Sequence, residues 1–281
     1  MLWRHRSFIR ISTLIAMAIA LAAAPGEAQR RGRGGAGEVE PLHGQLKELT
    51  PRPGVTQSFI LVRPKGAPVA SVILFTGGTG RLALSPSGIG SGKTNFVVRN
   101  REGFAEHGLL VAVVDTPSDH SADLGAFRAS EEHAQDVKAV IAFLRQTASV
   151  PVWLIGTSRG TVSAGNAAAR LTDGGPDGLV LTSSLVGGHA ESMRDVALDA
   201  IRVPTLVVHH KNDQCPASPY AGAQAMLTRL RNVPKHEFLA FDGGDTPRSE
   251  PCEALSYHGY LGLDAEVVKA IADWIKSAGK P

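Results

Sequence analysis

Short apolar runs alternate with longer helix-like segments over about 220 residues of this chain. Runs with no polar interruption are typical of strands that are covered on both faces of a parallel sheet. LLVAVVD (109–115) is such a run, and VPVWLIG (150–156), GLVLTSS (178–184) and VPTLVVHH (203–210) are also predicted to be buried strands. Because parallel strands need a long crossover between them, this alternation predicts one α/β domain with a mainly parallel sheet.

The segments around these runs complete the pattern. Residues 56–62, 69–75 and 235–241 are rich in Val, Ile, Leu and Phe and are predicted to be strands. Helices are predicted at 130–146, where Ser130 is a candidate N-cap, and at 158–171, 218–231 and 264–278. A further crossover helix is expected between Glu191 and Ile201.

The first 28 residues have the pattern of a secretory signal peptide. Arg4, Arg6 and Arg10 precede an apolar run of about 14 residues, and Gly26 and Ala28 suit a cleavage site before residue 29. The alternative is a membrane anchor, but the run is shorter than the roughly 20 residues that span a bilayer. We therefore expect an exported protein, periplasmic or secreted, without stable membrane insertion.

Residues 29–54 are predicted to be a flexible linker and N-terminal extension, so that the folded domain would cover 55–281. The formal net charge is +3, and loss of three arginines and one glutamate with the leader leaves about +1. A nearly neutral mature chain gives no electrostatic argument for binding nucleic acid.

The stretch GTSRG (156–160) lies between a predicted buried strand and a helix of small residues. A Gly-x-Ser-x-Gly in this context is typical of a nucleophile elbow, a tight turn that needs small residues on both flanks of the serine. A serine hydroxyl is a weak nucleophile and needs a base, which in turn needs an orienting acid. The alternative is an ordinary connection in which Ser158 caps the helix.

An acid and a histidine follow the serine in the order that this elbow requires. Asp213 comes directly after a buried strand, and His258 lies in the loop before the last helix. With these three positions, residues 55–277 resemble the α/β-hydrolase superfamily, particularly small dienelactone-hydrolase-like and esterase-like members. The resemblance implies the α/β-hydrolase fold, with helices on both faces of the sheet and no large cap domain.

The resemblance also implies an oxyanion hole built from backbone N–H groups. One donor would be Arg159, which follows the nucleophile. The other would be Gly78 or its neighbour Thr79 in the TGG turn (76–78), where Thr76 stands in place of the common histidine. No cofactor is implied.

Other polar residues offer alternatives to this site. Asp242 and Asp245 are rival acids, although they follow a different strand. The histidines at 120, 133, 189, 209 and 210 lack the spacing of metal ligands, so no metal site is expected. Residues 87–96 imitate a phosphate-binding loop but have Ser87 at the position of its first glycine, so a glycine-rich surface loop is expected instead.

The chain contains two cysteines, Cys215 and Cys252. If the loops that carry Asp213 and His258 meet at one cleft, the two sulfurs become neighbours, and an exported protein meets oxidising conditions. We therefore expect a disulfide between them, with two unpaired thiols as the alternative.

The combined expectation is a serine hydrolase that acts on a small acyl substrate through an acyl-enzyme intermediate. Ser158 would attack, His258 would transfer the proton and Asp213 would orient the imidazole. An exopeptidase or a transacylase with the same triad, and a binding protein on the hydrolase fold that does no chemistry, remain alternatives. Only about 18 residues separate the strand at 178–184 from the next one, which leaves no length for a lid.

Overall fold

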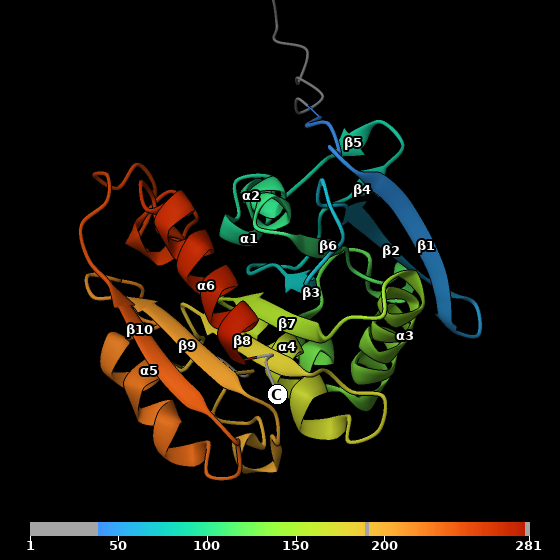
Figure 1. Ribbon diagram of the computed structural model, residues 1–281. Helices are drawn as coiled ribbons and strands as arrows, with labels where there is room; N and C mark the ends of the chain where they lie inside the picture. The colour runs from blue at the N-terminus through green and yellow to red at the C-terminus, as the bar shows by residue number, and fades with distance from the viewer. Residues whose placement is uncertain (1–38, 189–190, 279–281) are drawn as a thin grey trace, which may run out of the picture. The chain divides into compact units, whose positions relative to one another are not determined.

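The computed structural model describes residues 39–188 and 191–278. An eight-stranded sheet with the order β1-β2-β6-β3-β7-β8-β9-β10 forms the centre of this part of the chain (Figure 1). Its strands are β1 (Gln45–Arg52), β2 (Val55–Val62), β3 (Ala70–Phe75), β6 (Leu109–Val114), β7 (Val152–Thr157), β8 (Gly178–Thr182), β9 (Thr205–His210) and β10 (His236–Phe241). A small hairpin of β4 (Leu84–Ser85) and β5 (Gly88–Ile89) lies outside this sheet.

Parallel pairing runs from β6 through β3, β7, β8 and β9 to β10. Within this sheet β2 alone is reversed, because it pairs antiparallel with both β1 and β6. The strands β3, β6, β7, β8 and β9 are buried along their whole length. The sequence analysis predicted this mainly parallel sheet, and the structure confirms it.

Helices cover both faces of the sheet. They are α1 (Phe96–Arg99), α2 (Arg101–Glu106), α3 (Glu131–Thr147), α4 (Gly160–Arg170), α5 (Tyr220–Met226) and α6 (Asp264–Ala278). One core layer joins the sheet to α3, α4 and α5, and the other joins it to α1, α2 and α6. Successive side chains of β3 alternate between the layers, Ile73 in the first and Leu74 in the second, because strand side chains point to opposite faces in turn.

The helix at α3 begins where the sequence indicates. Ser130 is its N-cap, and the side chain of Ser130 accepts a hydrogen bond from the N–H of His133 at 3.0 Å. Glu131 and Glu132 lie in the first turn and Arg145 in the last, which complements the helix dipole. The predicted helix at 218–231 is shorter in the structure, where α5 ends at Met226 and a single 3₁₀ turn follows.

The predicted domain boundary at residue 55 is wrong. Residues 45–52, assigned to a flexible extension, form β1 and pair with β2 in register from Gln45 opposite Leu61. This strand lies at the edge of the sheet and its side chains are exposed or half-buried. Its sequence QLKELTPR therefore has no apolar run that would mark it as a strand.

The predicted crossover helix from Glu191 to Ile201 is also wrong, since the described part of this segment has only a 3₁₀ turn at Leu198–Ala200. Its polar groups make local bonds that compete with a helix. Asp195 accepts from the backbone N–H of Ser192 at 3.1 Å. Arg229, from a distant turn, donates to the carbonyl oxygens of Met193 and Val196, which a helix would use internally.

The proposed signal peptide (1–28) and residues 29–38 of the proposed linker and extension lie outside the described residues. Among the helices of the described ranges, none combines the length and the apolar character needed to span a bilayer.

Candidate active site

Ser158 lies in the turn between β7 and α4, at the end of the sheet where the parallel strands finish. Its φ angle is +53°, a conformation that is strained for a residue with a side chain. The backbone N–H of Ser158 donates to the carbonyl of Thr182 at the end of β8, at 3.0 Å. This strained strand–turn–helix is the geometry of a nucleophile elbow.

The two flanking glycines are required by close contacts. A Cβ on Gly156 would collide with the backbone of Gly160, and a Cβ on Gly160 would collide with the carbonyl oxygen of Phe75 in β3. The N-cap of α4 is Arg159 rather than Ser158. The alternative in which Ser158 serves as a helix cap is therefore not supported.

Asp213 follows β9 by three residues, and His258 lies in a 3₁₀ turn, Tyr257–Gly259, before α6. Their side chains meet, with His258 Nδ1 at 2.8 Å from Asp213 Oδ2. The Asp213 side chain is fully buried and that of His258 is 5% exposed. The other carboxylate oxygen, Oδ1, accepts the N–H of Cys215 at 2.9 Å.

The carboxylate of Asp213 stays ionised despite its burial. Burial acts to raise the pKa of Asp213, but hydrogen bonds from His209 and His258, the charge of His258 and the N–H of Cys215 outweigh it. Together they lower this pKa to about 2. At neutral pH the group is thus a permanent acceptor for the imidazole.

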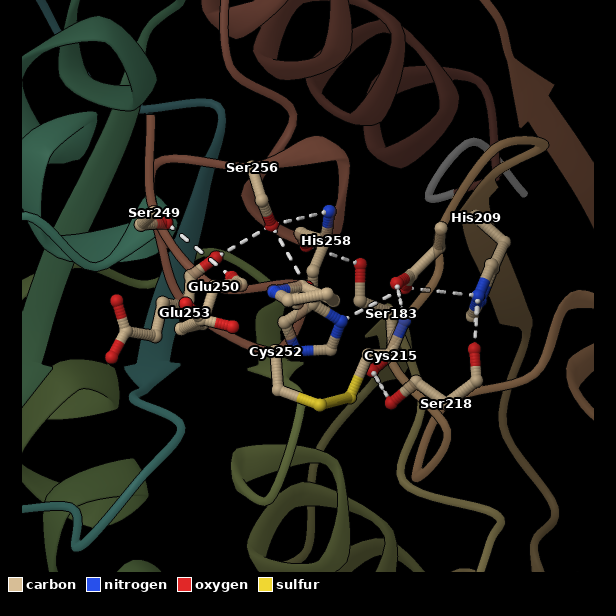
Figure 2. Close-up of a disulfide and its surroundings, with 12 residues drawn as sticks. Ser183, His209, Cys215, Ser218, Ser249, Glu250, Cys252, Glu253, Ser256 and His258 are labelled. Atoms are coloured by element: carbon tan, nitrogen blue, oxygen red, sulfur yellow. Dashed lines mark hydrogen bonds and ion pairs between the residues drawn. A yellow bond between two sulfur atoms is a disulfide. The ribbon is translucent and has the colours of Figure 1, made fainter. Parts of the chain in front are cut away.

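The backbone of His258 is fixed on both sides. Ser256 caps the turn by accepting the N–H of His258 at 3.1 Å, and Ser183 Oγ donates to the carbonyl oxygen of His258 at 2.7 Å (Figure 2). Tyr260 is buried and donates from its hydroxyl to the carbonyl of Val208 in β9 at 2.9 Å. The turn is therefore tied directly to the strand ends.

Two consecutive residues at the end of β8 bind the candidate serine and histidine. The carbonyl oxygen of Thr182 accepts the N–H of Ser158, and Ser183 Oγ donates to the carbonyl oxygen of His258. No hydrogen bond joins Ser158 Oγ to His258 within the described residues, and the buried Nε2 of His258 has no partner there. Bonds between a nucleophile and its base are often long before substrate binds. A histidine with one nitrogen on a carboxylate and the other unpaired has the arrangement of a general base.

The alternative residues do not take part in this arrangement. Asp242 accepts from the N–H of Gly243 at 2.9 Å and from the Asn212 side chain at 3.1 Å, so it structures its own loop. Asp245 lies against Gly262, close to where a Cβ would be. In residues 39–188 and 191–278, no group of three or more His, Cys, Asp and Glu side chains is placed to hold a metal ion.

The loop after β3 carries the expected second oxyanion donor. A Cβ on Gly77 would come within 2.9 Å of Ser158 Cβ, so only glycine allows this approach, whereas Gly78 faces open space with φ at +55°. Within the described residues the N–H groups of Gly78 and Arg159 donate no hydrogen bond. Both N–H groups are thus unpaired in the described residues, as the expected role of oxyanion donors requires.

A buried arginine, Arg128, donates a hydrogen bond to this loop. Arg128 is 1% exposed, and its guanidinium donates to the carbonyl of Gly78 at 3.2 Å and to Ser163 Oγ at 2.9 Å. Burial, together with the like charge of Arg159, lowers the pKa of Arg128 below its ordinary value. The sequence analysis missed this residue, because a lone arginine in a polar segment has no signal that separates it from a surface residue.

An open pocket of about 430 Å³ adjoins the oxyanion loop. Three loops form its walls, and they contribute Thr76, Gly77, Gly78, Thr79 and Arg81; Ser91, Gly92, Thr94 and Asn95; and Ser249, Cys252, Glu253, Ala254 and Leu255. The glycine-rich segment 87–96 thus belongs to the pocket wall. Most of the lining side chains are polar.

Arg99 donates hydrogen bonds to two of these loops. Its guanidinium donates to the carbonyl of Thr94 at 2.6 Å on one side, and to the carbonyls of Ala254 at 3.2 Å and Gly259 at 2.6 Å on the other. Its Nε is 2.7 Å from a carboxylate oxygen of Asp264 at the start of α6. No pattern in the sequence indicates this role, because it depends on where the two loops meet.

Cys215 and Cys252 form a disulfide. Figure 2 shows it beside His258, with His209 and Ser218 on the side of Cys215. The pairing that the sequence analysis expected is confirmed.

The fold was compared with known proteins. No protein-family model matches the chain, and a search of curated proteins finds no match. Among solved structures, a serine hydrolase homologue from Coxiella burnetii is 17% identical over 85% of this chain and 99% of its own, with a TM-score of 0.58. A serine hydrolase without a lid from Xanthomonas campestris has the same identity and TM-score over 85% and 97%. A dienelactone hydrolase from Anabaena variabilis is 19% identical over 84% and 99%, with a TM-score of 0.55. These likenesses, together with the mainly parallel eight-stranded sheet, show that this chain has the α/β-hydrolase fold.

Proposed function

We propose that this protein is an exported serine hydrolase that cleaves ester or related acyl bonds with Ser158, His258 and Asp213. One observation carries the proposal. His258 is held by a buried, ionised Asp213 at 2.8 Å, and its other ring nitrogen is buried without a partner in the described residues. The end of β8 binds both the turn of His258, through Ser183, and the strained Ser158, through Thr182. The likeness to solved serine hydrolases and esterases supports the same chemistry by analogy of fold.

In the proposed reaction Ser158 Oγ attacks the acyl carbonyl carbon, and the hydroxyl proton passes to His258 Nε2. The N–H groups of Arg159 and Gly78 receive the developing oxyanion, an effect worth about 2.7–4 kcal/mol for each donor. The imidazolium then gives its proton to the leaving oxygen, and the acyl-enzyme forms. Water repeats the sequence, with His258 as base and Ser158 as leaving group.

The pocket supports a small, polar substrate. Its walls are mostly backbone and hydroxyl, amide or charged side chains, and its volume of about 430 Å³ lies in the lower part of the range for small-molecule sites. Export is proposed from the leader pattern at 1–28, and the disulfide is of the kind that persists in oxidising compartments. Sequencing of the mature N-terminus tests export, with Gln29 expected as the first residue.

A fluorophosphonate probe on the purified mature protein tests the chemistry. We expect one label on Ser158, and no label on the variants Ser158→Ala and His258→Ala although both still fold. Replacement of either residue is also expected to lower kcat on any cleaved ester by several orders of magnitude. An unlabelled wild-type protein would instead indicate a binding protein on a hydrolase fold. Labelling with transfer to an acceptor alcohol in place of hydrolysis would indicate a transacylase, and release of N-terminal peptide residues an exopeptidase.

A further inference from the structure

A second histidine contacts the carboxylate of Asp213. His209 lies in β9, four residues before Asp213, and its side chain is fully buried. Its Nε2 is 3.3 Å from Asp213 Oδ2, the same oxygen that contacts His258 Nδ1. The proposed mechanism assigns no role to this residue.

The neighbours of His209 fix which of its nitrogens carries the hydrogen. Nε2 is 2.9 Å from the carbonyl oxygen of Ser218, and a carbonyl only accepts. Nε2 therefore bears the hydrogen and donates it to Ser218 (Figure 2). The same N–H group lies 3.3 Å from Asp213 Oδ2. The ring of Tyr220 packs edge-on against the imidazole, with 5.8 Å between the centroids, which holds the ring in this orientation.

The carboxylate of Asp213 thus has polar contacts with three nitrogen groups. His258 and His209 share Oδ2, and the N–H of Cys215 binds Oδ1. Without His209, the contact with His258 itself would be the remaining polar contact of Oδ2 among those described. The bond from His209 lies on the oxygen that has to stay aligned, whereas Cys215 restrains the other one.

We propose that His209 is a positioning residue for the acid of the triad, holding Asp213 Oδ2 in line with His258 Nδ1. This inference rests on the proposed function, since it assigns a role in the reaction of Ser158. Because the role is exercised through Asp213 and His258, loss of His209 changes kcat and leaves KM unaltered.

Two substitutions test it. His209→Leu fills the space and removes the donor, whereas His209→Gln restores an N–H donor near the position of Nε2. Leu206→Ala is the matched control, because Leu206 is a fully buried residue on the same strand, at the end far from Asp213. Its loss destabilises the core without removing a bond to the triad.

We expect His209→Leu to lower kcat by about tenfold to a hundredfold at constant KM, as a misaligned catalytic group does. His209→Gln should recover most of the loss, and Leu206→Ala should keep kcat near the wild-type value. The low-field proton resonance of the His258 Nδ1–H bond should move upfield in the Leu variant and stay in place in the other two.

A Leu variant that keeps its kcat, or an unmoved resonance, would overturn the inference. So would a Gln variant as impaired as Leu, because the donor would then be irrelevant. The resonance is measured without substrate. Failure of the proposed function itself is seen separately, as a wild-type protein that neither turns over esters nor takes the fluorophosphonate label.

Discussion

Cys215 and Cys252 join the loop that carries Asp213 to the loop that carries His258. Both ends of this disulfide lie close to the candidate active site. The N–H of Cys215 donates to Asp213 Oδ1 at 2.9 Å, and Cys252 lies in the wall of the pocket beside the oxyanion loop. The 2.8 Å contact between Asp213 and His258, which the proposed mechanism requires, is therefore supported by a covalent bond between their loops.

Removal of this bond should reduce both stability and activity. The disulfide closes a loop over a sequence separation of 37, which in the chain-entropy model stabilises the folded state by about 3–4 kcal/mol. We expect the double variant Cys215→Ser/Cys252→Ser to lose about that much free energy of unfolding in urea, and to lose kcat before it unfolds. Wild-type protein in reductant is the control. A variant with unchanged urea midpoint and kcat would show that neither loop depends on the bond.

The sequence indicates the residues of the candidate site more clearly than the elements around it, for a physical reason. A nucleophile elbow needs glycines at close backbone contacts, and buried parallel strands need apolar runs. Gly156, Gly160 and the strand ends can therefore be recognised from the local sequence. The positions of Asp213 and His258 then follow from the order of the strands. The fold comparisons bear out this architecture.

Features that depend on tertiary contacts have no such local pattern in the sequence. The strand β1 has half-exposed side chains at a sheet edge, and so its sequence resembles that of an extension. The segment 191–201 has helix-forming residues, but Arg229 binds its carbonyls from outside. In the sequence His209 is an ordinary strand residue, and its contact with Asp213 becomes visible only in the folded chain.

The ionisation of Asp213 should make stability depend on pH in an acidic window. Its pKa in the folded protein is about 2, below the value of about 3.9 for an unfolded chain. A depressed pKa stabilises the folded state fully above about pH 4, and this contribution is lost as the pH falls toward about 2. The contribution amounts to roughly 2 kcal/mol.

Urea unfolding at about pH 5, about pH 3 and about pH 2 measures this dependence. We expect the wild-type protein to lose more free energy of unfolding between the first and last conditions than Asp213→Asn, which cannot titrate at this position. Parallel pH profiles for the two proteins would mean that Asp213 has an ordinary pKa in the folded state.

Arg128 should matter more for catalysis than for stability. It is a buried cation whose bonds go to Gly78 and Ser163 rather than to a carboxylate. Replacement of a poorly compensated buried charge by an apolar side chain of similar size is often neutral for stability or stabilising. Loss of the bond to Gly78, however, frees the peptide next to the oxyanion donor.

For Arg128→Met we therefore expect kcat to fall about tenfold or more, with little change in Tm. Arg170→Met is the control, because Arg170 donates to the carbonyl of Ala129 on the same turn as Arg128 but lies at the surface. An Arg128→Met protein that melts many degrees lower and keeps its kcat would assign Arg128 to packing alone.

The connection between β8 and β9 should leave the pocket uncovered. In its described residues the 3₁₀ turn at Leu198–Ala200 is the sole regular element, and Met193, Val196 and Leu198 are buried in the core layer of α4. A Cβ on Gly165 in α4 would come within 2.8 Å of Met193 Cε, which places this connection against the helix. A lid for a lipid interface needs an exposed apolar face, and these apolar side chains are already packed.

We therefore expect hydrolysis of short-chain, soluble esters with simple saturation and no increase in rate when an emulsion forms. Rates for a short-chain and a long-chain ester series, each measured across its solubility limit, check this. The short-chain series serves as the control, because its members stay dissolved over most of the range. A sharp rise at the point where droplets of the long-chain ester appear would mean that an apolar segment moves to uncover the site, and it would contradict an open pocket.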